Sequence, residues 1–272
     1  MRHCMSLPKH PRAVITGAAS GLGRALALEL AGRQAKLLLA DLNDEGSRET
    51  ARLVADAGGE AHTVRCDVSR SDDVAALVSE ADRALGGVDL VVNNAGVSAS
   101  GQVGELSLED WSWIMGVNLW GVIHGCHAFT PRFKEQGSGH FLNVASAAGF
   151  LAVPGAASYC VTKAGVVALS ETLRLELAPH GVGVTVLCPT FFKTMIVESG
   201  RNFDAKTKAL VEKLMGRKGL QADYVARRAI EAVDAGRLYA VPHRDGRWFW
   251  RTKRAVPELF HHSVVSRLLG KL

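Results

Sequence analysis

The sequence has few cysteines, and none of them is placed for joint chemistry. Five cysteines occur among 272 residues, and no two of them lie closer than 28 residues apart. Without a C-x-x-C pair, the sequence predicts neither a zinc site nor a dithiol redox motif, and we expect no bound metal. We interpret the cysteines as reduced thiols of a cytoplasmic protein that serve mainly as packing residues.

Long apolar runs and low-complexity segments are also missing. No stretch approaches the roughly 20 apolar residues that a membrane-spanning helix needs. The first twelve residues are basic and contain no apolar segment of the kind found in secretory signal peptides, so we expect none. No internal repeat is found. With 47% hydrophobic residues, the chain can form one large α/β domain with a substantial core.

Residues 1–242 lack a net charge, since their 25 basic and 25 acidic residues balance. Residues 243–272 hold seven Lys and Arg against two acidic residues, and they account for the whole formal charge of +5. This uneven placement argues against a nucleic-acid-binding protein. We expect residues 1–242 to be one domain and residues 243–272 to be a separate extension.

The extension combines basic, aromatic and amphipathic character. Trp248 and Trp250 stand among arginines and lysines, and Pro257 is suited to a first helical turn. Apolar residues then recur at helical spacing: Val256, Leu259, Phe260, Val264, Leu268 and Leu269. Three interpretations stay open. The extension could pack on its own subunit or a neighbour, lie on a membrane surface so that the protein is membrane-associated, or bind nucleic acid, which is the weakest of the three.

Short β-like runs alternate with helical stretches along the chain. The expected strands are 13–16, 36–41, a run ending at 67, 88–93, 140–145, 182–187 and 238–241, with one helix reaching about Arg33 and another starting near Asp44. Nearly continuous apolar strands separated by helices predict a parallel sheet covered on both faces. Ligands of such a sheet bind beyond the carboxyl ends of its strands.

A glycine-rich loop joins the first expected strand to the first helix. Glycines at three positions of Thr16–Gly23 permit a tight turn and a close approach of backbone N–H groups to an anion. The residues expected at a dinucleotide pyrophosphate are Gly17, Ser20, Gly21, Leu22 and Gly23. The context supports this interpretation, because the loop follows a strand, opens a helix and has an acidic residue about 20 positions on.

That acidic residue is Asp41, at the end of the second strand. A carboxylate there can accept hydrogen bonds from the adenosine ribose and would repel a 2′-phosphate, so NAD is favoured over NADP. Arg24 is the nearest cation that could argue for NADP, and we interpret it as a solvated helix residue.

Tyr159 and Lys163 are four residues apart and would share one face of a helix. A free tyrosine has a pKa of about 10 and exchanges protons poorly at neutral pH. A nearby lysine cation favours the phenolate, so we expect the lysine to lower the pKa of the tyrosine. A tyrosine of this kind can pass a proton to or from an alcohol oxygen.

Together these motifs resemble the short-chain dehydrogenase/reductase family over roughly residues 11–242. The T-G-x-x-x-G-x-G motif is Thr16–Gly23, and the N-N-A-G motif is Asn93–Gly96. The resemblance implies a single Rossmann domain with seven strands in the order 3-2-1-4-5-6-7. It also implies further cofactor contacts at Asp67, Val68, Asn94, Ala95, Gly96, Tyr159, Lys163, Pro189 and Thr194.

The same resemblance implies a catalytic set of Asn118, Ser146, Tyr159 and Lys163. Tyr159 would exchange the proton, Ser146 would donate to the substrate oxygen, and Asn118 would hold a relay water. Ser146 as a helix N-cap and Asn118 as a partner of buried backbone are the alternative roles. One position departs from the family pattern: Thr190 stands where a glycine usually follows Pro189, near the nicotinamide.

The resemblance implies an NAD(P)-dependent oxidoreductase acting on a small-molecule alcohol or ketone. The substrate loops would be 95–105, 147–157 and a lid at about 190–218, with flexible ends at Gly200 and Gly216. These loops hold Phe150, Leu151, Val153, Phe191, Phe192, Met195 and Ile196, and few charges besides Lys193, so a lipophilic substrate is favoured. An NADPH-dependent carbonyl reductase and a non-catalytic cofactor-binding regulator are the alternatives. A homodimer or homotetramer through helices at about 107–135 and 157–178 is expected.

Overall fold

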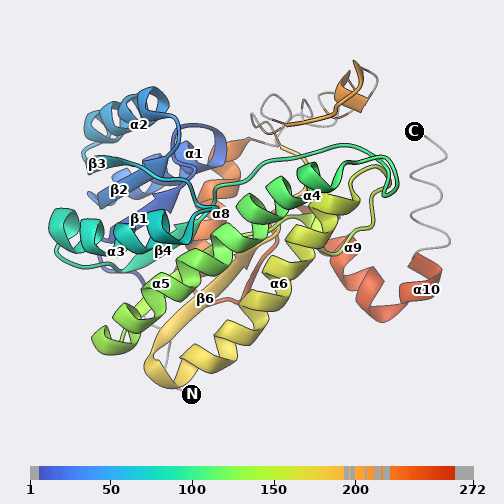
Figure 1. Cartoon of the computed structure of the whole chain (residues 1–272). Helices are drawn as coiled ribbons and strands as arrows, with labels where there is room; N and C mark the ends of the chain where they lie inside the picture. Colours follow the sequence, from blue (N-terminus) through green and yellow to red (C-terminus); the bar gives the residue numbers. More distant parts are fainter. Residues whose placement is uncertain are drawn as a thin grey trace.

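A computed structural model describes residues 6–192, 196, 200–205, 207–209, 211, 216 and 221–260 of the chain. Its centre is a seven-stranded parallel sheet in the order β3-β2-β1-β4-β5-β6-β7 (Figure 1). The strands are β1 (Arg12–Thr16), β2 (Lys36–Asp41), β3 (Glu60–Arg65), β4 (Leu90–Asn93), β5 (Gly139–Val144), β6 (Val182–Leu187) and β7 (Tyr239–Ala240). The predicted fold and strand order are confirmed.

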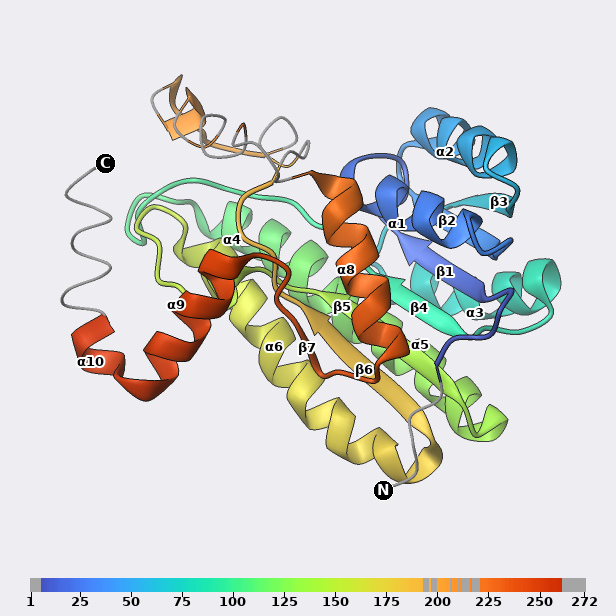
Figure 2. The same cartoon turned by 180° about the vertical axis from the view of Figure 1, so that it is seen from behind.

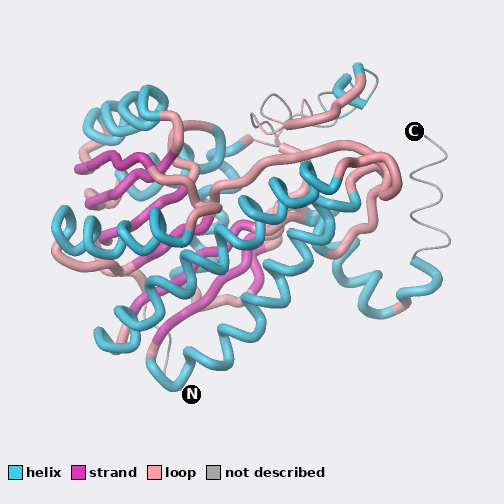
Figure 3. Tube along the Cα trace, in the orientation of Figure 1, coloured by secondary structure: helices cyan, strands magenta, loops and turns pink. Residues whose placement is uncertain are grey.

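Helices cover both faces of the sheet, and the tube in Figure 3 shows the strands enclosed between them. One face carries α1 (Gly21–Ala31), α2 (Asp44–Asp56) and α8 (Ala222–Asp234), as seen from behind in Figure 2. The other carries α3 (Ser71–Leu85), α4 (Leu108–Met115), α5 (Gly121–Gln136) and α6 (Ala157–Leu177) (Figure 1). The apolar core is accordingly split by the sheet into two large clusters.

Local sequence explains some boundaries of these elements. The side chain of Asn43 caps α2 by accepting a hydrogen bond from the N–H of Gly46 at 2.9 Å. Helix α3 ends at Gly86, which has the left-handed conformation (φ 71°) that glycine adopts without strain. The expected bounds need small corrections: α1 ends at Ala31 and not near Arg33, and β3 ends at Arg65, two residues early.

The extension packs against the body as far as the structure describes it. Helix α9 (Arg244–Ala255) follows β7 and is continued by α10 (Pro257–Leu259) (Figure 2). The guanidinium of Arg254 lies over the rings of Tyr239 and Trp250, at 5.2 and 4.5 Å from their centroids, and bonds to Glu171 of α6 at 3.2 Å. These contacts favour packing on its own subunit for residues 243–260; Val264, Leu268 and Leu269 lie outside the described residues.

None of the helices in the described segments has the length and apolar character needed to cross a bilayer.

Candidate active site

The glycine loop lies at the carboxyl end of β1 and is held by the chain that follows β4. The side-chain amide of Asn94 donates to the carbonyls of Thr16 and Gly17, at 2.8 and 3.0 Å. Gly17 has a φ of +65°, and a Cβ placed on Gly23 would lie 2.0 Å from the carbonyl oxygen of Gly17. The turn therefore requires glycine at both positions.

The start of helix α1 is open to an anion. Its N-cap residue, Ser20, makes no side-chain capping bond, and no acidic residue occurs in its first turn. Gly21, with a φ of +51°, lets the chain enter the helix directly from the loop, and Leu22 next to it is buried. First-turn N–H groups and the helix dipole are thus left to a negatively charged group, and the loop fits the pyrophosphate of a dinucleotide.

Asp41 reaches back to the same loop from the end of β2. Its carboxylate accepts from the backbone N–H of Ala19 at 2.9 Å and of Asn43 at 3.0 Å.

The interpretation of Arg24 as a solvated residue is wrong. Its guanidinium is partly buried and donates to the carbonyl of Ala19 at 2.6 Å and to the hydroxyl of Thr50 at 3.0 Å. Arg24 is therefore engaged in holding α1 against the loop and α2.

The further residues expected at the cofactor also lie at the carboxyl ends of their strands. Asp67 follows β3 and accepts from both the N–H and the hydroxyl of Ser69, at 3.0 and 2.7 Å. Val68 is buried beside Gly121 of α5. Ala95 donates its N–H to the hydroxyl of Thr16 at 3.1 Å, which ties the chain after β4 to β1. Thr194 lies outside the described residues.

Ser146, Tyr159 and Lys163 meet where β5 ends and α6 begins. Ser146 follows β5 and caps the 3-10 turn at Ala147–Gly149 by accepting from the N–H of Ala148 at 3.1 Å, so its capping role is present. The ammonium of Lys163 is buried, donates to the carbonyl of Val144 at 2.9 Å and lies 5.7 Å from the ring centroid of Tyr159.

Burial dominates the titration of this pair. It raises the pKa of Tyr159 to about 12, against the opposing effect of hydrogen bonding by Ser146. It lowers the pKa of Lys163 to about 8. The expected lowering of the Tyr159 pKa is therefore not found, because desolvation of the phenolate outweighs the hydrogen bond from Ser146. At neutral pH the phenol of Tyr159 is therefore protonated.

Asn118 lies in a π-helical turn, Gly116–Trp120, between α4 and α5. Its side chain is fully buried, accepts from the N–H of Val97 at 2.8 Å and donates to the carbonyl of Val97 at 2.9 Å. A Cβ placed on Gly96 would lie 3.4 Å from its Oδ1 and 3.6 Å from the ammonium of Lys163. Asn118 thus satisfies backbone groups, and Gly96 leaves open the space that it shares with Lys163.

An apolar wall stands beside Tyr159. A small buried cluster packs against the tyrosine ring and contains Ala99, Leu106 and Ile114, with Val97, Trp111 and Trp113 partly buried around it. The two tryptophans were not predicted at the site, although both lie in α4, the helix that leads into the Asn118 turn. Arg201 lies 4.0 Å over the ring of Trp113.

The expected substrate loops need corrections. Phe192 does not line a pocket, since it is 8% exposed and packs in the core cluster with residues of α1 and α8. Phe191 is 42% exposed, and Phe150 packs partly against the other cluster. Lys193, Met195 and most of the expected lid lie outside the described residues.

The loop after β6 has a partner that sequence reasoning missed. Pro189 accepts a hydrogen bond from the N–H of Ala147 at 2.8 Å, which places it beside the turn that Ser146 caps. Thr190 contacts His243, the residue before α9, through its backbone N–H at 3.1 Å. Thr190, which stands where the family pattern has a glycine, was a signal that this loop departs from that pattern. No feature of the sequence indicated that His243 would be its hydrogen-bond partner.

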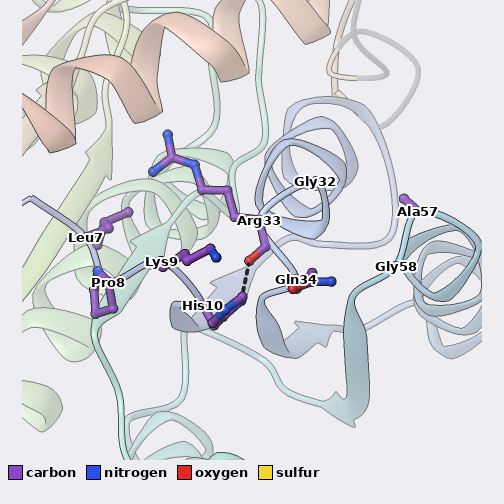
Figure 4. Close-up of a pocket in the computed structure, with 9 residues that line it drawn as sticks. All are labelled: Leu7, Pro8, Lys9, His10, Gly32, Arg33, Gln34, Ala57 and Gly58. Atoms are coloured by element: carbon purple, nitrogen blue, oxygen red, sulfur yellow. Dashed lines mark hydrogen bonds between the residues drawn. The ribbon is translucent and has the colours of Figure 1, made fainter.

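A separate pocket opens at the other end of the strands (Figure 4). It is lined by Leu7, Pro8, Lys9, His10, Gly32, Arg33, Gln34, Ala57 and Gly58. Gln34 precedes β2 and Gly58 precedes β3, so this pocket lies at amino ends of strands, away from Tyr159. Its arginine is paired with Asp234 at 2.7 Å. The pocket is therefore not part of the site.

Comparisons with known proteins agree with this arrangement. The family model described as short chain dehydrogenase matches residues 11–204. The crystal structure of a short chain dehydrogenase/reductase from Burkholderia phymatum in complex with NAD is similar with a TM-score of 0.84 and 36% identity, covering 95% of this chain and 96% of that chain. The 3beta-hydroxysteroid dehydrogenase 1 of Eggerthella lenta is 36% identical over 226 residues, 81% of this chain and 86% of its own length. The D-beta-hydroxybutyrate dehydrogenase of Rhizobium meliloti is 35% identical over 205 residues, 74% of this chain and 78% of its own length.

Proposed function

Since the chain belongs to the short-chain dehydrogenase/reductase family, whose enzymes oxidise CH–OH groups or reduce carbonyls with NAD(P), we propose that it interconverts a lipophilic secondary alcohol and the corresponding ketone with NAD. The observation that carries the proposal is the convergence of Ser146, Tyr159 and Lys163 at the carboxyl end of β5. The glycine loop suited to a dinucleotide lies at the same edge of the sheet, two strands away along the order β1-β4-β5.

Tyr159 is the proton donor and acceptor in this proposal. When bound, the nicotinamide supplies or accepts the hydride. In the reducing direction the protonated phenol delivers its proton to the substrate oxygen, which agrees with a pKa of about 12. In the oxidising direction the phenolate of Tyr159 must form. The buried cation of Lys163, 5.7 Å from the ring centroid, then stabilises the negative charge of the phenolate.

Ser146 and Asn118 have supporting roles. The hydroxyl of Ser146 accepts from the N–H of Ala148 and is hydrogen-bonded to Tyr159. A rotation of this hydroxyl would let it donate to a substrate oxygen as charge develops there. Asn118 holds Val97 by two hydrogen bonds and faces the space at Gly96 shared with Lys163. We propose that a water in this space links Lys163 to solvent, as the family resemblance implies.

The preference for NAD rests on Asp41. Its carboxylate stands at the end of β2 and is oriented by two backbone N–H groups of the loop region. A 2′-phosphate would meet this negative charge, whereas a ribose diol can donate hydrogen bonds to it. Arg24, the nearest cation, is already bonded to Ala19 and Thr50. These contacts favour NAD over NADP.

The lipophilic substrate is supported by the wall beside Tyr159. Trp111 and Trp113 belong to that wall, and Phe191 offers a further exposed ring after β6. An apolar, aromatic lining recognises a ligand by shape and by burial of apolar surface. One relative, the 3beta-hydroxysteroid dehydrogenase, is named for a substrate of this character.

The remaining expectations about assembly are also proposals. We propose that residues 1–242 form the catalytic domain, with a substrate lid at about 190–218 and residues 243–272 as its extension. We propose a homodimer or homotetramer through the helices α4 to α6, where Trp120 and Val161 are 52% and 48% exposed. Light scattering of the purified protein tests the assembly, and a monomer would contradict it.

The experiment that tests the function is a panel of alcohols and ketones followed by nicotinamide absorbance. We expect turnover with NAD and higher efficiency on hydrophobic secondary alcohols than on short polyols. Running the same substrates with NADP tests the cofactor choice. Absence of turnover with both cofactors across the panel would contradict the proposal, and faster turnover of the polyols would contradict the lipophilic substrate.

A further inference from the structure

The start of the extension is bonded to the loop after β6, at the residue where that loop departs from the family pattern. The backbone N–H of Thr190 donates to Nδ1 of His243 at 3.1 Å, and the hydroxyl of Thr190 lies 2.9 Å from the same nitrogen. The methyl of Thr190 lies 3.0 Å from the position of a Cβ on Gly246, in the first turn of α9. The first turn of α9 is therefore packed directly on Thr190.

These contacts determine which nitrogen of His243 carries the proton. A backbone N–H can only donate, so Nδ1 must be unprotonated, and a neutral ring then has its proton on Nε2. The Thr190 hydroxyl has a second acceptor in the carboxylate of Asp245 at 3.4 Å. If His243 were protonated on both nitrogens, its Nδ1–H would face the backbone N–H of Thr190. The hydrogen bond from Thr190 to Nδ1 would then be lost.

The other side of the ring has a donor without a partner. His243 is 5% exposed, and its Nε2 is buried and has no hydrogen-bond partner among the described residues. The ring of Tyr224 in α8 lies against it, with centroids 5.9 Å apart. A buried N–H without an acceptor destabilises the fold, so the structure calls for an acceptor at this point, such as a bridging water.

The loop that His243 holds is joined to the catalytic residues. Within it, the N–H of Cys188 donates to Ala240 of β7 at 2.8 Å, and the carbonyl of Pro189 accepts from Ala147 at 2.8 Å. Ala147 directly follows Ser146. A shift of Thr190 would therefore be transmitted to the turn that Ser146 caps.

We propose that His243 is a positioning residue for the cofactor: it holds the loop Cys188–Thr190 in the conformation that receives the nicotinamide end. The C-terminal extension thereby becomes part of the cofactor site, and His243 compensates for the threonine that replaces a glycine. The inference rests on the proposed function, since it presumes that a nicotinamide cofactor binds there.

The test compares two ligands that differ only at the nicotinamide. Calorimetry would give the Kd of NAD and of ADP-ribose, which lacks the nicotinamide, for the full-length protein and its variants. For His243→Leu we expect about a tenfold weaker Kd for NAD, the equivalent of one lost hydrogen bond, and an unchanged Kd for ADP-ribose. His243→Asn carries an amide oxygen near the place of Nδ1, and we expect it to recover most of the NAD affinity.

Two further variants serve as controls. Arg244→Ala changes the exposed neighbour of His243 and should bind both ligands as the wild type does. His243→Gln is polar, but its side chain is too long to place an oxygen at the position of Nδ1. We therefore expect the glutamine variant to bind NAD as weakly as His243→Leu does. It takes the place of His243→Leu in the test if the leucine variant does not fold. Thermal unfolding without ligand checks the fold of each protein.

Unchanged NAD affinity in both His243→Leu and His243→Gln would overturn the inference. An equal loss of NAD and ADP-ribose binding would also overturn it, because the effect would then be a general loss of structure. A wild-type protein that binds ADP-ribose and NAD but turns over no alcohol would count against the proposed function and leave the role of His243 standing.

Discussion

Replacing Asn118 by alanine should destabilise the protein as well as the site. Asn118 is fully buried and bridges the π-helical turn to the chain after β4 through both backbone groups of Val97. Alanine would leave the N–H and the carbonyl of Val97 without these partners. Within the described part of the chain, Asn118 is the one residue whose side chain bonds to the N–H or the carbonyl of Val97.

The size of the effect follows from these contacts. Val97 is only partly buried, so each lost bond should cost about 1 kcal/mol, and the volume of the missing amide should cost about 1 kcal/mol more. The free energy of unfolding should fall by about 3 kcal/mol, which lowers the Tm by roughly 6–12 °C for a chain of this size.

Denaturant and thermal unfolding of the protein without ligand would measure the change. Thr162→Val is the matched control. Its hydroxyl lies 3.4 Å from the amide nitrogen of Asn118 and donates to the carbonyl of Tyr159 in its own helix, so the partners of Val97 stay in place. We expect a loss below about 1 kcal/mol for this control. If Asn118→Ala were as stable as Thr162→Val, the structural role derived for Asn118 would be refuted.

Other perturbations separate the remaining roles. Tyr159→Phe should keep cofactor binding by calorimetry and lose a factor of about 10²–10⁴ in kcat, and near-normal turnover would contradict the acid–base assignment. Asp41→Asn keeps an oxygen for the N–H of Ala19 but removes the charge, so the ratio of NADP to NAD efficiency should rise by about 10–100-fold; a ratio within twofold of the wild type would argue against the role of Asp41. Burial lowers the pKa of His140 to about 3, below its ordinary value of 6.5, so its contribution to stability is present above pH 6.5 and is lost as the pH falls toward 3. His140→Gln should reduce the slope of unfolding free energy between pH 6 and pH 4 by about 1.4 kcal/mol per pH unit, and equal slopes would exclude the histidine as the cause.

The strand pattern and the glycine loop were predictable because both depend on local chain properties. An apolar run such as Lys36–Asp41 specifies a buried parallel strand by its own composition, and the observed bounds of β2 are those predicted. Gly17 and Gly23 follow from the close backbone approach that the turn imposes. The spacing of four positions from Tyr159 to Lys163 places both on one side of α6 for the same reason.

What the sequence determined, then, is the topology of the sheet and the set of residues gathered at its carboxyl edge. The tertiary structure alone decided what those residues face. Arg24 binds the loop and α2, and Phe192 belongs to the core. The pKa of Tyr159 is raised because burial exceeds the opposing effect of the Ser146 hydrogen bond. Thr190 met His243 across 53 positions of sequence. Contacts of that range arise when separate elements pack together, and no local pattern of residues encodes them.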